Sequence, residues 1–215
     1  MKRFYAILLV AALLLALIPV AGAAERQVVY VDGTRSSSGD GGSAATAVNR
    51  LEAAYALLPR EAGGTIVICG RTETGDWSER LETEPFAAPV TLTSRYGAED
   101  YTAKAALVFT DRYFYFGGAT VLTDLLLETS INTYLYSGPD LTVAGSVRTS
   151  MTETDAKLSI YCGQKTARCE SVRLDLAGGT FTQVLLSCAK GTGTTAARLS
   201  GNVIINSNVT LGASG

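Results

Sequence analysis

Large apolar residues recur in short clusters along most of this chain, and small residues close each cluster. Five pentapeptides share the pattern, with mostly large apolar residues in the first three places and small ones in the last two; they begin at Ile66, Val90, Phe114, Tyr134 and Ser159. Their starts are separated by 24, 24, 20 and 25 residues, and a weaker sixth copy begins 26 residues later, at Leu185. A repeat of this period predicts a solenoid.

Further strands are predicted between the pentapeptides, where short runs rich in β-branched and aromatic residues alternate with Gly, Asn, Asp, Ser and Thr. The intervals leave no room for the helices of about 10 to 15 residues that an α/β fold requires. The chain is therefore predicted to be all-β over most of its length. The runs cover residues 28–31, 106–110, 121–127, 141–147, 172–176 and 203–205.

One helix is predicted, over residues 46–58. Val48, Leu51 and Tyr55 recur there at helical spacing, and Pro59 follows the end of the pattern. The helix has a single apolar stripe and precedes the first pentapeptide. We expect it to cap the N-terminal end of the solenoid, because open strand edges invite aggregation.

The period favours a right-handed parallel β-helix, in which three short strands form each turn and stack on the equivalent strands of the next turn. An antiparallel β-sandwich is the alternative, but it predicts turns every 8–12 residues or so and no longer repeat. Stacking aligns equivalent repeat positions into interior ladders. The expected ladders are Ile66/Val90/Phe114/Tyr134 and Ile68/Leu92/Phe116/Tyr136/Tyr161.

The first 23 residues have the features of a secretory signal peptide. Lys2 and Arg3 precede an apolar run over residues 4–20, and Ala21-Gly22-Ala23 has the form of a cleavage site. An uncleaved membrane anchor is the alternative, and no later stretch is apolar enough to span a bilayer. We expect a secreted or cell-surface protein whose mature chain lacks a membrane span.

The mature chain then divides into two predicted parts. Residues 24–62 form an N-terminal strand, a polar loop and the capping helix, and residues 63–215 form the β-helix. The sequence is still strand-like at residue 215. We therefore expect the β-helix to continue beyond that point, and pairing of the last turn with a partner chain is the alternative.

Charge and composition exclude several classes of function. Removal of the signal peptide leaves 16 basic against 20 acidic residues, which argues against nucleic acid as a partner. The chain has no His, and therefore lacks both the commonest general base and the commonest transition-metal ligand. The pairing of the four cysteines stays open between Cys162–Cys188, Cys162–Cys169 and buried free thiols; they are Cys69, Cys162, Cys169 and Cys188.

Several segments together resemble the N-terminal part of secreted bacterial proteins with a pectin-lyase-like β-helix. The resemblance covers most of the mature chain and implies a fold that carries lyases, hydrolases, adhesins and inert stalks. The segments that carry it are Tyr30–Gly33, Gly39–Gly41, Ala44–Ala47, Leu51–Ala54, Gly63–Gly70 and Leu174–Phe181.

This resemblance implies that an enzyme of the group would carry carboxylates on one outer face in neighbouring turns, for calcium or for hydrolysis. At the 20-residue offset, however, Asp124 aligns with Ala144 and Glu128 aligns with Arg148, so no carboxylate ladder results. We interpret the candidates as solvated loop charges and assign no catalytic residue. They are Asp111, Asp124, Glu128, Asp140 and Asp175.

Two other groups of residues have both a binding and a structural interpretation. Asp32 and Asp40 flank a Gly-rich loop and could hold calcium, although turn formation is the favoured interpretation. Five tyrosines could form an aromatic platform for sugars, but Tyr134, Tyr136 and Tyr161 occupy predicted interior positions. The other two tyrosines are Tyr113 and Tyr115, and Tyr115 is the best surface candidate of the five.

The sequence thus predicts a secreted or cell-surface β-helix scaffold that is adhesin-like or contacts glycans. A polysaccharide or a cell-wall glycan is the expected partner, and no cofactor or metal ligand is assigned. The alternative is a polysaccharide lyase or glycoside hydrolase whose catalytic turns lie beyond residue 215. A purely structural spacer is a third interpretation.

Overall fold

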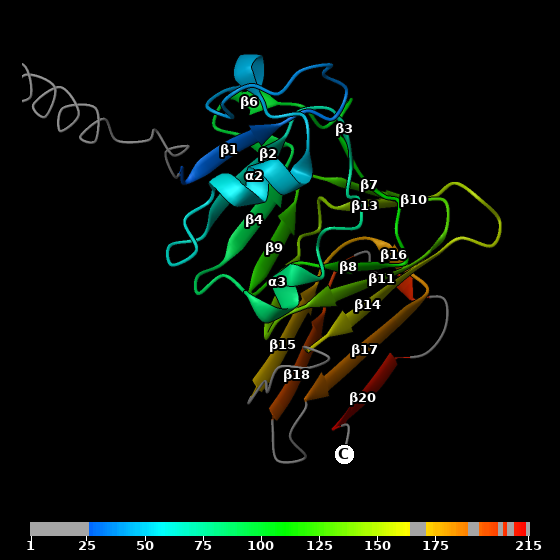
Figure 1. Cartoon of the computed structure of the whole chain (residues 1–215). Coiled ribbons are helices and arrows are strands. Elements are labelled where there is room, and N and C mark those ends of the chain that lie inside the picture. Colours follow the sequence, from blue (N-terminus) through cyan, green and yellow to red (C-terminus); the bar gives the residue numbers. More distant parts are fainter. Residues whose placement is uncertain (1–25, 164–170, 189–193, 202–203, 206–208, 214–215) are drawn as a thin grey trace, which may run out of the picture.

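The computed structural model describes residues 26–163, 171–188, 194–201, 204–205 and 209–213. The described chain is mostly β, as predicted, with few helices (Figure 1). The predicted signal peptide, residues 1–23, lies outside the described residues, as does Cys169.

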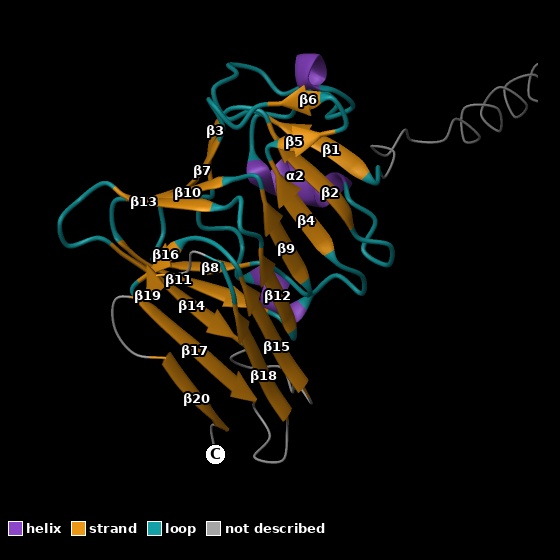
Figure 2. Ribbon diagram, turned by 180° about the vertical axis from the view of Figure 1, so that it is seen from behind, coloured by secondary structure: helices purple, strands orange, loops and turns teal. Residues whose placement is uncertain are grey.

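Three parallel sheets contain most of the strands. The first sheet, seen side by side in Figure 2, runs in the order β1 (Val28–Val31), β2 (Gly64–Ile68), β4 (Val90–Thr93), β9 (Thr120–Thr123), β12 (Asp140–Val143), β15 (Ser171–Leu176) and β18 (Thr194–Leu199). The second sheet contains β3 (Arg71–Glu73), β7 (Ala106–Phe109), β10 (Leu126–Thr129) and β13 (Arg148–Met151). The third contains β8 (Tyr113–Tyr115), β11 (Asn132–Ser137), β14 (Lys157–Cys162), β17 (Gln183–Cys188) and β20 (Val209–Ala213).

The chain visits these sheets in a repeating order. It passes from the second sheet to the third and then to the first in β7–β8–β9, again in β10–β11–β12, and again in β13–β14–β15. A further parallel pair joins β16 (Thr180–Phe181) to β19 (Ile204–Ile205). Within the described residues, antiparallel pairing occurs only between β5 (Arg95–Tyr96) and β6 (Glu99–Asp100), so the pairing of an antiparallel sandwich is not observed.

The predicted alignment of the pentapeptides is correct for one neighbouring pair only. The fourth and fifth copies align as expected, with Tyr136 opposite Tyr161. The first two copies pair in the first sheet, but Ile66 lies opposite Leu92 rather than Val90. The third copy lies in the third sheet and is shifted by one residue, so the predicted ladder through Ile66, Val90 and Phe114 is wrong.

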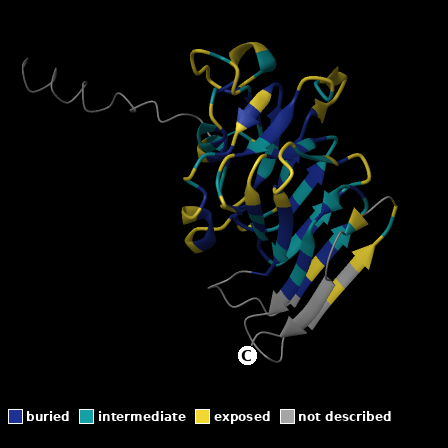
Figure 3. Ribbon diagram, turned by 90° about the vertical axis from the view of Figure 1, so that its right-hand side faces the viewer, coloured by how far each residue is buried: buried dark blue, intermediate teal, exposed yellow. Residues whose placement is uncertain are grey.

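The core lies between the sheets. In the third sheet, the residues that face the core are the ones that alternate with those predicted to do so. Phe114, Leu135, Ile160 and Val184 are fully buried and pair in register across β8, β11, β14 and β17. Tyr134, Tyr136 and Tyr161 alternate with these residues and therefore lie on the outer face, because successive side chains of a strand point to opposite faces. Figure 3 shows buried segments through the stack and exposed segments mainly in the loops.

The predicted helix is present but shorter than expected. Helix α2 (Leu51–Leu57) follows a 3-10 turn, η1 (Ala44–Thr46), and buries Leu51, Ala54 and Tyr55 beside β1. The α-helix starts late because the backbone of Val48 is used to bridge Val31 of β1. A second short helix, α3 (Arg80–Thr83), lies beside β8 (Figure 1).

Candidate functional site

Five tyrosine rings form a continuous group on the outer face of the third sheet. We call them the tyrosine ladder; they are Tyr113 and Tyr115 of β8, Tyr134 and Tyr136 of β11, and Tyr161 of β14. The strands pair in parallel with Tyr113 opposite Tyr134 and with Tyr115, Tyr136 and Tyr161 in one row. Stacked strands about 4.8 Å apart bring such side chains into contact.

The ring geometry confirms this contact. Tyr115 and Tyr136 stack with centroids 4.9 Å apart and an interplanar angle of 16°. Tyr136 and Tyr161 are 5.2 Å apart at 37°, and Tyr113 and Tyr134 are 5.8 Å apart at 27°. Two of these pairs are stacked and one is tilted, and the contacts hold the rings together as a pre-formed surface.

Exposure and protonation differ along the ladder. Tyr113 is 42% exposed, Tyr134, Tyr136 and Tyr161 are half-buried, and Tyr115 is buried. Burial, followed by the nearby Glu82 carboxylate, raises the pKa of Tyr115 to about 12. Burial also raises the pKa values of Tyr136 and Tyr161. These three phenols therefore remain protonated at neutral pH and keep a hydroxyl donor.

Charged groups border the exposed end of the ladder. The guanidinium of Arg112 lies over the rings of Tyr113 and Tyr134, 5.4 and 5.6 Å from their centroids. A hollow of about 160 Å³ adjoins Tyr113 and Tyr115. Its charged lining residues are Asp76, Glu79, Asp111 and Arg112. The hollow offers a few polar groups beside an aromatic surface, which is the usual composition of a ligand site.

A buried carboxylate lies at the other side of the ladder. Glu82 of α3 is only 9% exposed, and its Oε1 has no hydrogen-bond partner among the described residues. It lines a narrow cleft together with Tyr115 and Tyr136. A buried, unsatisfied oxygen is costly and rare, so Glu82 is a candidate acceptor for a ligand hydroxyl.

The small places of the pentapeptides position this carboxylate. Gly117 has φ +73°, and a Cβ there would lie 2.7 Å from Cβ of Leu81. The absence of a side chain at Gly117 therefore lets α3 pack directly on the end of β8 and place Glu82 beside the rings. The sequence pattern identified neither Glu82 nor Arg112 as a site residue.

Among the five carboxylates considered from the sequence, Asp111 alone is near the ladder. Glu128 accepts two hydrogen bonds from Arg71, and these bonds lower its pKa. Glu128 lies opposite Ser150 rather than Arg148, so the predicted alignment was wrong by two residues. The other candidates also have ion partners: Asp124 with Arg95, Asp140 with Arg173 and Asp175 with Arg198.

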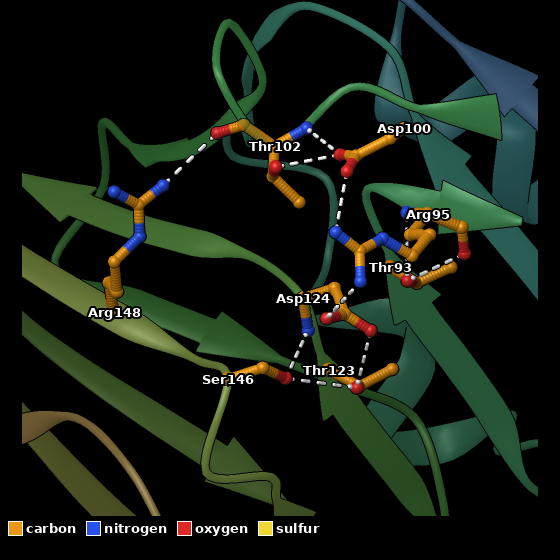
Figure 4. Close-up of polar contacts among 8 residues, drawn as sticks. All are labelled: Thr93, Arg95, Asp100, Thr102, Thr123, Asp124, Ser146 and Arg148. Carbon is orange, nitrogen blue, oxygen red and sulfur yellow. Dashed lines mark hydrogen bonds and ion pairs between the residues drawn. The ribbon is translucent and has the colours of Figure 1, made fainter.

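Asp124 belongs to a polar cluster that Figure 4 shows in detail. Its backbone adopts φ +48°, and its N–H donates to Oγ of Ser146 at 2.8 Å. Arg95 donates to Asp100 at 2.5 Å and lies 3.9 Å from Asp124. Hydrogen bonds from Thr102 and then Arg95 lower the pKa of Asp100 to about 2. The cluster joins the β5–β6 hairpin to the sheets, and its charged groups already have partners.

The two aspartates of the N-terminal loop form turns. Asp32 Oδ1 accepts hydrogen bonds from the backbone and the hydroxyl of Thr34, at 3.0 and 2.6 Å. Asp40 accepts one from the backbone of Gly42 at 2.9 Å and one from Arg26 at 2.9 Å. The turn interpretation is therefore confirmed. Among the described residues, no group of three His, Cys, Asp or Glu is arranged to hold a metal ion.

The two cysteines with described side chains are both buried. Cys69 is a free thiol, and burial raises its pKa to about 12. The sulfur of Cys162 lies 3.8 and 3.6 Å from the carbonyl oxygens of Gly138 and Arg173. Cys162 pairs with Leu186 across the strands and Cys188 pairs with Ala213, so Cys162 and Cys188 do not lie directly opposite each other.

Comparisons with known proteins do not assign the site. The chain matched no protein-family model, no characterised protein and no solved structure. Within the described residues, no helix has the length and apolar character needed to cross a membrane. The function is therefore argued from the tyrosine ladder and its surroundings.

Proposed function

We propose that this protein is a secreted or cell-surface scaffold that contacts glycan chains through the tyrosine ladder. The observation that carries the proposal is the row of contacting tyrosine rings on the outer face of three neighbouring strands of the third sheet. The faces of sugar rings expose apolar C–H groups, and an aromatic face packs well against such a surface. A row of rings suits an extended polymer better than a small isolated ligand.

Polar groups beside the rings support the same proposal. Sugar hydroxyls need hydrogen-bond acceptors as well as an apolar contact surface, and the unsatisfied Oε1 of Glu82 is such an acceptor. Asp111 and Glu79 line the hollow at the exposed end. The acidic balance of these groups favours neutral or amino-sugar glycans over acidic polysaccharides.

The proposed scaffold is a right-handed parallel β-helix, as the resemblance to pectin-lyase-like proteins implies. The repeating order of the three parallel sheets supports this architecture. Parallel crossover connections are right-handed in about 98% of cases, which supports the handedness. The proposed location outside the cell rests on the sequence of residues 1–23.

An enzymatic function gains no support from the described residues. Four of the five carboxylates considered as catalytic candidates are ion-paired, and the remaining one, Asp111, adjoins the ladder. A lyase or hydrolase with catalytic turns beyond residue 215 stays the alternative proposal. Release of soluble sugars from a polysaccharide by a chain extended beyond residue 215, but not by residues 1–215 alone, would favour that alternative.

Retention on insoluble polysaccharides tests the glycan proposal. The wild-type protein is expected to sediment with at least one of cellulose, chitin, xylan and peptidoglycan. Tyr134→Ala should weaken retention about tenfold or more, because it removes a half-buried ring from the ladder. Tyr96→Ala is the matched control, because Tyr96 is also an exposed tyrosine (42%) but lies on β5, outside the tyrosine ladder. Equal retention of both variants and the wild type would overturn the proposal.

A further inference from the structure

A second, larger cavity lies near the N-terminal end of the stack and shares only Asp76 with the hollow beside the tyrosine ladder. It has a volume of about 580 Å³, within the range of small-molecule sites. Two segments form its walls: residues 33–35 with 49–52, and residues 71–77. Trp77 lines the cavity and is the only tryptophan of the chain.

Two of the charged groups in this cavity are already neutralised by partners outside it. Glu52 pairs with Arg80 at 3.0 Å. Arg71 donates two hydrogen bonds to Glu128, one of them at 2.8 Å. Neither of these residues therefore presents an uncompensated charge to a ligand.

The remaining charges are separated by sign. Arg35 and Arg50 lie on the wall built from residues 33–35 and 49–52, which we call the basic wall. Glu73 and Asp76 lie on the other segment, residues 71–77, which we call the acidic wall. No ion pair links any of these four residues to another described residue, although the Glu73 carboxylate is close enough to Arg71 to help raise its pKa.

One donor on the basic wall has no partner. Nε of Arg35 is buried and makes no hydrogen bond to any described residue. A buried N–H without an acceptor is unfavourable, and the guanidinium of Arg35, which lines the cavity, can pair with a carboxylate there. Arg35 is thus suited to bind an anionic group in the cavity.

We propose that this cavity binds a zwitterionic small molecule of the class of free amino acids and short unblocked peptides. The ligand carboxylate lies on the basic wall and the ligand ammonium group lies on the acidic wall. A purely anionic or purely cationic ligand would gain one of these interactions and be repelled by the other wall.

Trp77 fluorescence provides the test. The full protein is titrated with the dipeptide Ala-Ala, with its N-acetyl derivative and with its C-terminal amide. Ala-Ala should produce a saturable change, and each blocked derivative should bind at least tenfold more weakly. The absence of a saturable change with Ala-Ala, or equal binding of a blocked derivative, would overturn the proposal.

Variants locate the binding and separate it from the glycan proposal. Arg35→Gln should weaken Ala-Ala binding at least tenfold, and Glu73→Gln should do the same. Glu153→Gln and Tyr134→Ala should leave it unchanged, because neither residue lines the cavity. Unchanged binding in both cavity variants would contradict the proposed site, whereas loss of polysaccharide retention in Tyr134→Ala concerns the tyrosine ladder alone.

Discussion

Several tyrosine hydroxyls in the described part of the protein have strongly raised pKa values. Burial raises the pKa values of Tyr30 and Tyr55 far above 10, and it raises those of Tyr101 and Tyr115 to about 12. Each phenol holds its proton more tightly in the folded chain than in the unfolded chain. Folding is therefore coupled to pH on the alkaline side.

We predict that the free energy of unfolding falls between pH 10 and pH 12. The unfolded chain loses phenolic protons near pH 10, whereas the folded chain retains them, so the stabilisation is complete below pH 10 and is lost as the pH rises through the folded pKa values. Urea unfolding at a series of pH values measures this. A denaturation midpoint that stays constant from pH 9 to pH 12 would contradict the raised pKa values of these tyrosine hydroxyls in the folded chain.

Glu82 has a different role at the residue scale, because its buried oxygen lacks a partner. We predict that Glu82→Gln stabilises the protein by about 1 kcal/mol, since it removes a buried charge while preserving shape. The same change should weaken polysaccharide retention. Thermal unfolding and sedimentation measure the two effects, and Glu84→Gln on the exposed surface is the control. Lower stability with unchanged retention would mean that Glu82 is a structural residue.

At the scale of elements, α3 and β8 are joined by the close contact between Gly117 and Leu81. This contact was not predictable from local sequence, because Gly117 belongs to a repeat whose other small places have different neighbours. The ion pair between Arg71 and Glu128 was not predictable either, because the two residues are 57 positions apart in the chain. Only the folded stack brings them together.

We predict that Gly117→Ala destabilises the protein more than Gly97→Ala. Both glycines have positive φ, +73° and +60°, so both substitutions impose backbone strain of about 1 kcal/mol. At Gly97 a Cβ would meet nothing within 4 Å, whereas at Gly117 it would displace Leu81 and α3. The additional cost at Gly117 is about 1–3 kcal/mol. Chemical denaturation compares the variants, and equal losses would refute the packing role of this glycine.

For the whole molecule, the repeat period correctly predicted a mostly β fold with parallel strands, and the helical spacing of Val48, Leu51 and Tyr55 correctly predicted a helix near its N-terminal end. It did not predict which face of the third sheet is buried. The run Tyr134-Leu135-Tyr136 has large residues at every position, so size and apolarity alone do not distinguish its two faces. Burial favours Leu135, because its side chain has no hydroxyl that must keep a hydrogen bond.

That change of parity turns a predicted interior ladder into the proposed binding surface, and tyrosine nitration tests it most directly. Tetranitromethane should modify Tyr113 and Tyr134 in the free protein, with modified positions identified by peptide mass spectrometry. A polysaccharide that retains the protein should protect both residues while leaving Tyr96 reactive. Ladder tyrosines that are unreactive in the free protein, or that are nitrated equally with and without bound polysaccharide, would contradict the account.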